Sequence, residues 1–134
     1  TIGVWVSSLN HCNYCVDHHF SGLKRLLDDD QRAGALRAAI EARNIDAAPL
    51  DKTQKLGLVY AEQLTVRAAS LTEDTVIQLR STGFSDGEIL EINQVAAYFN
   101  YANRTVLGLG CSTTGDILGL SPNNSDNPDD WSHT

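Results

Sequence analysis

The sequence lacks a long uninterrupted apolar stretch, a cluster of basic residues and a secretory leader. No stretch approaches the length of a membrane span, so we expect a water-soluble protein. Ten Lys and Arg residues are scattered among seventeen Asp and Glu, and the formal net charge is -7. Because nucleic acid and anionic membranes bind concentrated positive charge, neither is an expected partner. Without a basic leader and an apolar segment before a cleavage site, the expected location is cytoplasmic.

Cysteine is also scarce, with three residues in 134. A chain of this length buries most of its apolar surface in one domain and does not need disulfides for stability. In a reducing compartment, a close cysteine pair is more often catalytic or metal-binding than structural. The pair Cys12 and Cys15, in the stretch CNYCVDHH at residues 12–19, therefore points to chemistry.

Strand-like alternation is missing, and apolar residues recur at helical spacing along most of the chain. The pattern predicts helices over 2–9, from about 10 or 13 to 28–30, over 31–43, over 53–69, from Thr72 to Gly83 and from Ser85 to about Leu109. Thr72 is a predicted N-cap, and Ser85 with Glu88 predicts a capping box. The fold class is therefore all-α, in a single helical domain.

The predicted domain covers residues 1–111, and we expect its N-terminus to be truncated because Thr1 lies inside an apolar helical pattern. After Cys111 the composition changes to Gly, Ser, Asn, Asp and Pro, which cannot form much packed core. Residues 112–134 are therefore predicted to be an irregular tail, with Trp131 docked on the domain.

The cysteine pair falls at the predicted start of a helix, and its three-residue spacing puts both side chains on one face. The partial positive charge of a helix amino end stabilises a thiolate, which predicts a lowered thiol pKa. His19 lies one turn beyond Cys15 on the same face and is placed to take its proton. His18 points away from that face and is the weaker candidate.

Three interpretations of the cluster remain open on spacing alone. The cysteines and histidines could fill a helix interface, because free Cys is often buried. They could bind zinc, but a structural zinc site needs four ligands, and Cys111 and His133 are isolated. They could form a dithiol redox site on helices, without metal or cofactor. We interpret Cys111 as a non-catalytic thiol, and Asn100, Asn103 and Arg104 as capping, solvated or intersubunit residues.

The run VSSLNHCNYCVDHH resembles the signature of the alkylhydroperoxidase D-like group within the carboxymuconolactone decarboxylase superfamily, in particular its peroxidase-related branch. Further stretches are similar to the same branch: LGLVYAEQLT at 56–65, GFSDGEILEI at 83–92, AAYFNYANR at 96–104 and the ending DWSHT. The resemblance covers nearly the whole chain.

The resemblance implies an all-helical homo-oligomer that reduces peroxides with a cysteine pair and a proton relay. By position, Cys15 would be the peroxidatic thiolate, Cys12 the resolving cysteine and His19 a member of the relay. Two departures concern that relay. Tyr14 stands where the better-known members have a histidine, and the family's relay glutamate would fall immediately before Thr1.

We therefore expect a thiol-dependent peroxidase with Cys12, Cys15 and His19 at its site. Its expected partners are a hydroperoxide substrate, an external dithiol reductant and further copies of the chain. The alternative is a non-catalytic redox-sensing or stress-response oligomer that uses the same dithiol.

Overall fold

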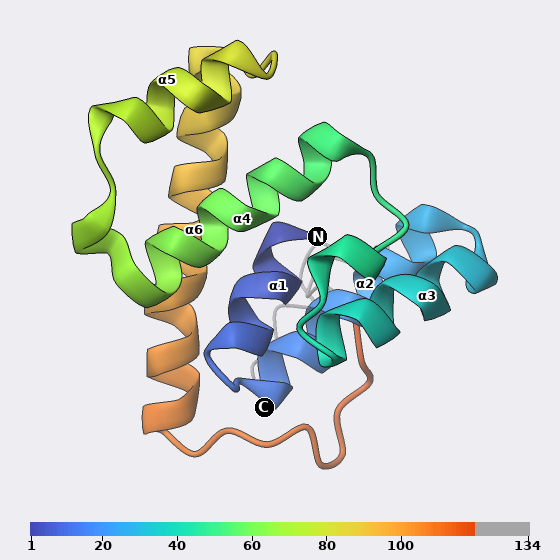
Figure 1. The fold of residues 1–134 in the computed structure, drawn as a ribbon. Helices are drawn as coiled ribbons and strands as arrows, with labels where there is room; N and C mark the ends of the chain where they lie inside the picture. Colours follow the sequence, from blue (N-terminus) through green and yellow to red (C-terminus); the bar gives the residue numbers. More distant parts are fainter. Residues whose placement is uncertain (120–134) are drawn as a thin grey trace, which may run out of the picture.

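The computed structural model describes residues 1–119, and this part of the chain is helical without strands, which confirms the all-α prediction (Figure 1). The α-helices are α1 (Ile2–Leu9), α2 (Asn13–Leu27), α3 (Asp30–Glu41), α4 (Lys52–Arg67), α5 (Glu73–Ser81) and α6 (Asp86–Gly108). Two short 3₁₀ helices, Ile45–Ala47 and Ala68–Ser70, flank α4. No helix in this range is long and apolar enough to cross a membrane.

The short helix α1 is the centre of the fold, with α2 and α3 on one side and α4 and α6 on the other (Figure 1). Its residues from Gly3 to Ser7 are all buried, because it contacts all four of these helices. A helix that is buried all round must be apolar all round, and the sequence IGVWVSSL meets this requirement except for its two serines. Helices α2, α3, α4 and α6 are packed around it.

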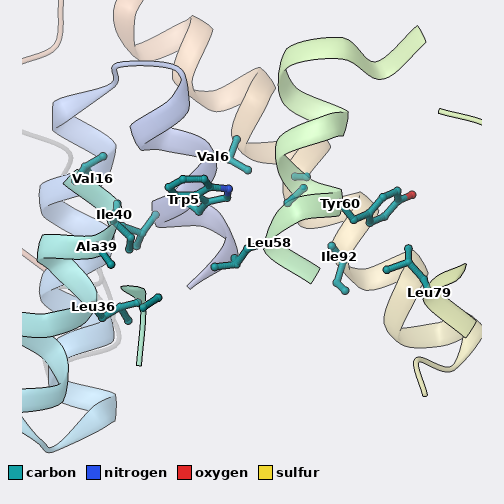
Figure 2. Close-up of a cluster of buried hydrophobic side chains, with 14 of the residues drawn as sticks. Trp5, Val6, Val16, Leu36, Ala39, Ile40, Leu58, Tyr60, Leu79 and Ile92 are labelled. Carbon is teal, nitrogen blue, oxygen red and sulfur yellow. The ribbon is translucent and has the colours of Figure 1, made fainter. Parts of the chain in front are cut away.

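Figure 2 shows the core on both sides of Trp5. Leu36 and Ile40 of α3 lie on one side, and Leu58 of α4 and Ile92 of α6 lie on the other. Each of these side chains is at most 7% exposed. Their burial supplies the main favourable free energy of folding, about 1.5–3 kcal/mol for each large aliphatic side chain.

The predicted helix boundaries depend on caps that the structure confirms. Ser85 Oγ accepts a hydrogen bond from the Glu88 amide at 3.3 Å, and the Glu88 carboxylate accepts one from the Ser85 amide at 2.8 Å. Thr72 is the N-cap of α5. A further capping box, with Asp51 and Gln54 bonded at 2.8 and 3.1 Å, starts α4 and was not predicted.

After α6 the chain turns back along α2 (Figure 1). Ser21 donates a hydrogen bond to the carbonyl of Leu118 at 3.2 Å, and Arg25 donates one to the carbonyl of Gly119. Most of the predicted tail, including the predicted docking of Trp131, lies outside the described residues. The domain boundary at residue 111 and the oligomer interface remain predictions.

Close approach of α1 and α6 requires glycine at position 3. A Cβ atom there would collide with the ring of Phe99. We predict that Gly3→Ala lowers the free energy of unfolding by about 1–3 kcal/mol, the usual cost of overpacking a core, measured by urea denaturation. Gly34→Ala is the matched control, because nothing lies within 4 Å of a Cβ in the middle of α3. It should stabilise the protein by about 0.5–1 kcal/mol, and equal effects of both changes would contradict the assignment.

Candidate active site around Cys12 and Cys15

The two cysteines lie at the junction of α1 and α2. Helix α1 ends at Leu9, His11 adopts a left-handed backbone with φ of 57°, and Cys12 is the N-cap of α2. The amide of Cys12 donates a hydrogen bond to the Ser7 carbonyl at 2.9 Å, which fixes the turn on the last turn of α1. The tight turn therefore positions Cys12 above the first turn of α2, which carries Cys15.

The sulfur atoms of Cys12 and Cys15 are 3.0 Å apart, and both are free thiols. A disulfide needs an S–S distance of about 2.05 Å, so a small rotation of one side chain would allow the bond to form. The predicted proximity of the pair is confirmed. The arrangement can cycle between a dithiol and a disulfide without unfolding of α2.

Burial dominates the acidity of Cys15. Cys12 is 0% exposed and Cys15 4% exposed. Removal of Cys15 from water, together with its hydrogen bond to Cys12, raises its pKa from 9.0 to about 12. The sequence predicted the opposite direction, from the helix amino end alone. That prediction is wrong for the reduced chain because loss of hydration penalises the anion more than the helix end stabilises it.

We predict that the raised Cys15 pKa makes the reduced protein less stable in alkali. Below about pH 9 the thiol is protonated in both states, and above it the unfolded chain releases the proton while the folded chain keeps it until about pH 12. The free energy of unfolding should therefore fall as the pH rises through this window. Urea titrations under reducing conditions at about pH 8 and about pH 10 measure this loss. Cys15→Ser should lose less stability between the two, and an equal loss would contradict the burial argument.

His19, the predicted proton acceptor, lies on α2 with its ring edge-on to Phe99 of α6, at 4.7 Å between centroids. Burial and the neighbouring His18 lower its pKa, so the imidazole is neutral at pH 7 and can accept a proton. No hydrogen bond joins His19 to either sulfur within residues 1–119. A proton from Cys15 would therefore reach it through water or after a small movement.

His18, the weaker candidate in the sequence, has the better-defined polar partner. Its Nε2 lies 2.9 Å from Asp116 Oδ2, and its ring lies 4.6 Å from the ring of Tyr14. Burial raises the pKa of Tyr14, and the negative charge of Asp116 adds to this, so the phenol keeps its proton. The sequence could not show that His18 lies beside both Tyr14 and Asp116, because Asp116 is far from α2 in the chain.

Cys111 is nearer to the site than its isolation in the sequence suggested. It follows the end of α6, and its amide donates a hydrogen bond to the Val106 carbonyl at 3.1 Å. Among the smaller causes of the raised pKa of Tyr14 and of Cys15 is the electrostatic influence of Cys111, so Cys111 lies within electrostatic range of both groups. Cys111 is an exposed free thiol, unlike the buried pair.

A cavity of about 980 Å³ opens beside α2. Tyr14, His18 and His19 line it together with Phe99 and apolar residues of α1, α4 and α6. Phe99 lines this cavity, whereas its neighbours Tyr98 and Tyr101 are exposed on α6. The cavity brings the predicted relay group His19 beside a space for an apolar ligand. The two sulfurs are not part of its lining.

Within the described part of the chain, no group of three or more His, Cys, Asp or Glu side chains is arranged to hold a metal ion. The side-chain amides of Asn10, Asn100 and Asn103 form a hydrogen-bonded group at the end of α1, in which Asn10 Nδ2 donates to Asn100 Oδ1 and to Asn103 Oδ1, each at 3.0 Å. Asn103 is fully buried, and its Nδ2 donates a hydrogen bond to Ser7 Oγ at 3.0 Å. The interpretation of Asn103 as a solvated or intersubunit residue is wrong. Helical periodicity could have placed it inward, one turn after Phe99.

Solved structures provide the comparison with known proteins. An uncharacterized peroxidase-related protein from Silicibacter sp. TM1040 is 33% identical, with a TM-score of 0.73 over 83% of this chain and 56% of that chain. An alkylhydroperoxidase AhpD core structure, an uncharacterized peroxidase-related protein from Ralstonia eutropha JMP134, is 22% identical, with a TM-score of 0.69 over 97% of this chain and 59% of that chain. No family model matches the chain, and no curated protein does.

The first match confirms the predicted resemblance to peroxidase-related proteins, and the second shows that the helical fold is that of an alkylhydroperoxidase AhpD core structure. The chain spans less than two thirds of the length of both proteins.

Proposed function

We propose that this chain, which has the alkylhydroperoxidase D-like fold, carries the active site of a thiol-dependent peroxidase that reduces hydroperoxides through Cys12 and Cys15. The observation that carries the proposal is the pair of free, buried sulfurs 3.0 Å apart at the start of α2. The relationship to peroxidase-related proteins supports the reaction class.

In the proposed reaction the Cys15 thiolate attacks the terminal oxygen of the hydroperoxide, and the O–O bond breaks. The leaving alkoxide takes a proton and departs as the alcohol, while Cys15 becomes a sulfenic acid. The Cys12 sulfur then attacks Cys15, releases water and forms the disulfide. An external dithiol supplies two electrons and two protons to restore both thiols. The short distance between the sulfurs supports Cys12 as the resolving partner.

Proton transfer is the demanding step, because burial holds the Cys15 thiol protonated at neutral pH. We propose that the neutral imidazole of His19 accepts this proton, through water. Tyr14 keeps its phenolic proton and is placed by its contact with His18, so it can supply a hydrogen bond where better-known members of the superfamily have a histidine. The apolar cavity beside His19 favours an organic hydroperoxide over a small polar peroxide.

Cys15→Ser should abolish consumption of an organic hydroperoxide such as cumene hydroperoxide in the presence of dithiothreitol. Cys12→Ser should still react once, and dimedone should then label the sulfenic acid on Cys15, which mass spectrometry detects. His11→Asn is the matched control, since His11 lies next to Cys12 but contacts Arg43 at 2.9 Å. It should retain turnover. Dimedone labelling of Cys12 in place of Cys15 would reverse the assigned roles.

His19→Gln tests the proton acceptor. Loss of a general base costs about 10²–10⁴-fold in rate, so kcat/KM for the hydroperoxide should fall within this range. The loss should shrink as the pH approaches that at which Cys15 ionises without help. If His19→Gln changes turnover no more than His11→Asn does, His19 is not the acceptor.

One observation favours a second candidate function. Both sulfurs are buried and the Cys15 pKa is raised, which also suits a sensor dithiol that reacts slowly and rarely. Such a protein would form the Cys12–Cys15 disulfide stoichiometrically with peroxide and show no sustained turnover with dithiothreitol. Assembly into homo-oligomers is proposed for both functions, and size-exclusion chromatography with light scattering would measure it.

A further inference from the structure

Side-chain amides join the turn that carries Cys12 to helix α6. This turn connects α1 to α2, and Asn10 stands in it, just before His11 and Cys12. Asn10 Nδ2 donates hydrogen bonds to Asn100 Oδ1 and to Asn103 Oδ1, each at 3.0 Å. The turn is thus bonded through one side chain to two residues of α6 that lie about one helical turn apart.

A second contact reaches the same turn through Ser7, the last buried residue of α1. Asn103 Nδ2 donates to Ser7 Oγ at 3.0 Å, and the Ser7 carbonyl accepts a hydrogen bond from the amide of Cys12 at 2.9 Å. Asn103 and Ser7 are both 0% exposed. A buried amide costs free energy unless its polar groups are paired, which favours a single orientation of Asn103. Asn103 therefore holds the turn at Asn10 with its oxygen and at Ser7 with its nitrogen.

The orientation of the amides is determined by a charged group on the surface. Arg104 is exposed and donates to Asn100 Oδ1 at 3.0 Å, and a guanidinium can only donate. Asn100 therefore presents its oxygen to the nitrogen of Asn10, which in turn requires the oxygen of Asn103. Asn100 Nδ2 points the other way and donates to Thr65 Oγ1 at 3.1 Å. The amides thus form a link with one set of orientations between the turn and α6.

The position of this turn matters for the disulfide. To form it, the sulfurs of Cys12 and Cys15 have to approach from 3.0 Å to about 2.05 Å. Cys15 lies within α2, whereas Cys12 is its N-cap and belongs to the turn. A turn that is free to move gives the Cys12 sulfur more positions in the dithiol than in the disulfide, where the covalent bond holds it. Holding the turn therefore favours the disulfide, because less conformational entropy is lost when the bond forms.

We propose that Asn10 and Asn103 are positioning residues that hold Cys12 beside Cys15 and thereby stabilise the disulfide relative to the dithiol. The proposal rests on the proposed function in taking these two cysteines as the redox pair. Helix α6 carries neither cysteine, yet its polar contacts with the turn then set how readily the oxidised pair is reduced.

The test is the redox equilibrium of the pair with glutathione, measured without peroxide. Two glutathione thiols reduce the disulfide with two electrons and two protons and become oxidised glutathione. The background is Cys111→Ser, which removes the exposed third thiol. Acid quenching, alkylation with a maleimide and mass spectrometry then measure the oxidised and reduced fractions.

Asn10→Ala deletes the direct link between the turn and α6. Freeing the backbone of one residue corresponds to about a factor of ten in an equilibrium constant. The equilibrium constant for disulfide formation should therefore fall about tenfold, which raises the reduction potential of this two-electron couple by about 30 mV. Ser7→Ala removes the second link and should shift the equilibrium in the same direction.

The reduction potential separates positioning from a general loss of stability. A change that destabilises the oxidised and the reduced folded states equally leaves the potential unchanged, because the potential depends only on the difference between them. Asn93→Ala is the matched control, since it removes a side-chain hydrogen bond of α6 to Tyr60, at 3.1 Å, about two helical turns before Asn100. Its equilibrium constant should stay within about twofold of the background. Urea denaturation of the reduced proteins compares the stability lost in each variant.

Circular dichroism checks that each variant folds, and Ser7→Ala decides the question by itself if Asn10→Ala does not fold. The proposal is overturned if either folded variant raises the equilibrium constant for disulfide formation or leaves it within about twofold of the background. Peroxide turnover with an unchanged equilibrium contradicts this inference alone, whereas a shifted equilibrium without turnover contradicts only the peroxidase.

Discussion

The burial of α1 between four other helices is the constraint on which the rest of this structure depends. It requires a helix that is apolar on all sides, and it requires glycine where Phe99 of α6 crosses closest. Because α1 is held from all sides, its last turn has one position relative to α2 and α6. The amide of Cys12 is hydrogen-bonded to the Ser7 carbonyl, so the position of α1 also fixes the position of Cys12.

The same burial sets the chemistry of the dithiol. It removes both sulfurs from water, brings them within 3.0 Å and raises the energy of the thiolate. A buried reactive group of this kind needs polar neighbours that replace water at the moment of charge development. Helix α2 carries the neutral imidazole of His19 one turn after Cys15, and the buried Asn103 side chain hydrogen bonds Ser7, whose carbonyl anchors the turn at Cys12. The packing of the helices around α1 therefore both stabilises the fold and sets the acidity of Cys15.

The raised Cys15 pKa and the proposed nucleophilic role are compatible when the proton leaves as the reaction proceeds. A thiol that is protonated at rest is protected from unspecific oxidation and alkylation. Under the proposed function, reactivity then depends on a group that acts as the charge forms, His19 by accepting the proton. The His18–Asp116 pair, at 2.9 Å, joins the chain after α6 to α2.

Much of the local structure was present in the sequence. Apolar periodicity located the helices, the Ser85 capping box located the start of α6, and the three-residue spacing predicted that Cys12 and Cys15 would meet. These features depend on residues within about one helical turn of each other, so they can be read without knowledge of packing. The position of His19 on the face of Cys15 and its role as proton acceptor remain predictions.

Two features of the site depend on tertiary structure. The direction of the Cys15 pKa shift follows from how deeply the packed helices bury it, which no local pattern states. The partners of His18 and Asn10 come from residues 116, 100 and 103, which are brought near only when α6 and the chain after it pack on α1 and α2. The sequence by itself therefore determined the helices and the cysteine pair, through short-range spacing. The tertiary structure decided how acidic the Cys15 thiol is and what surrounds it, because burial and long-range contacts exist only after the helices pack.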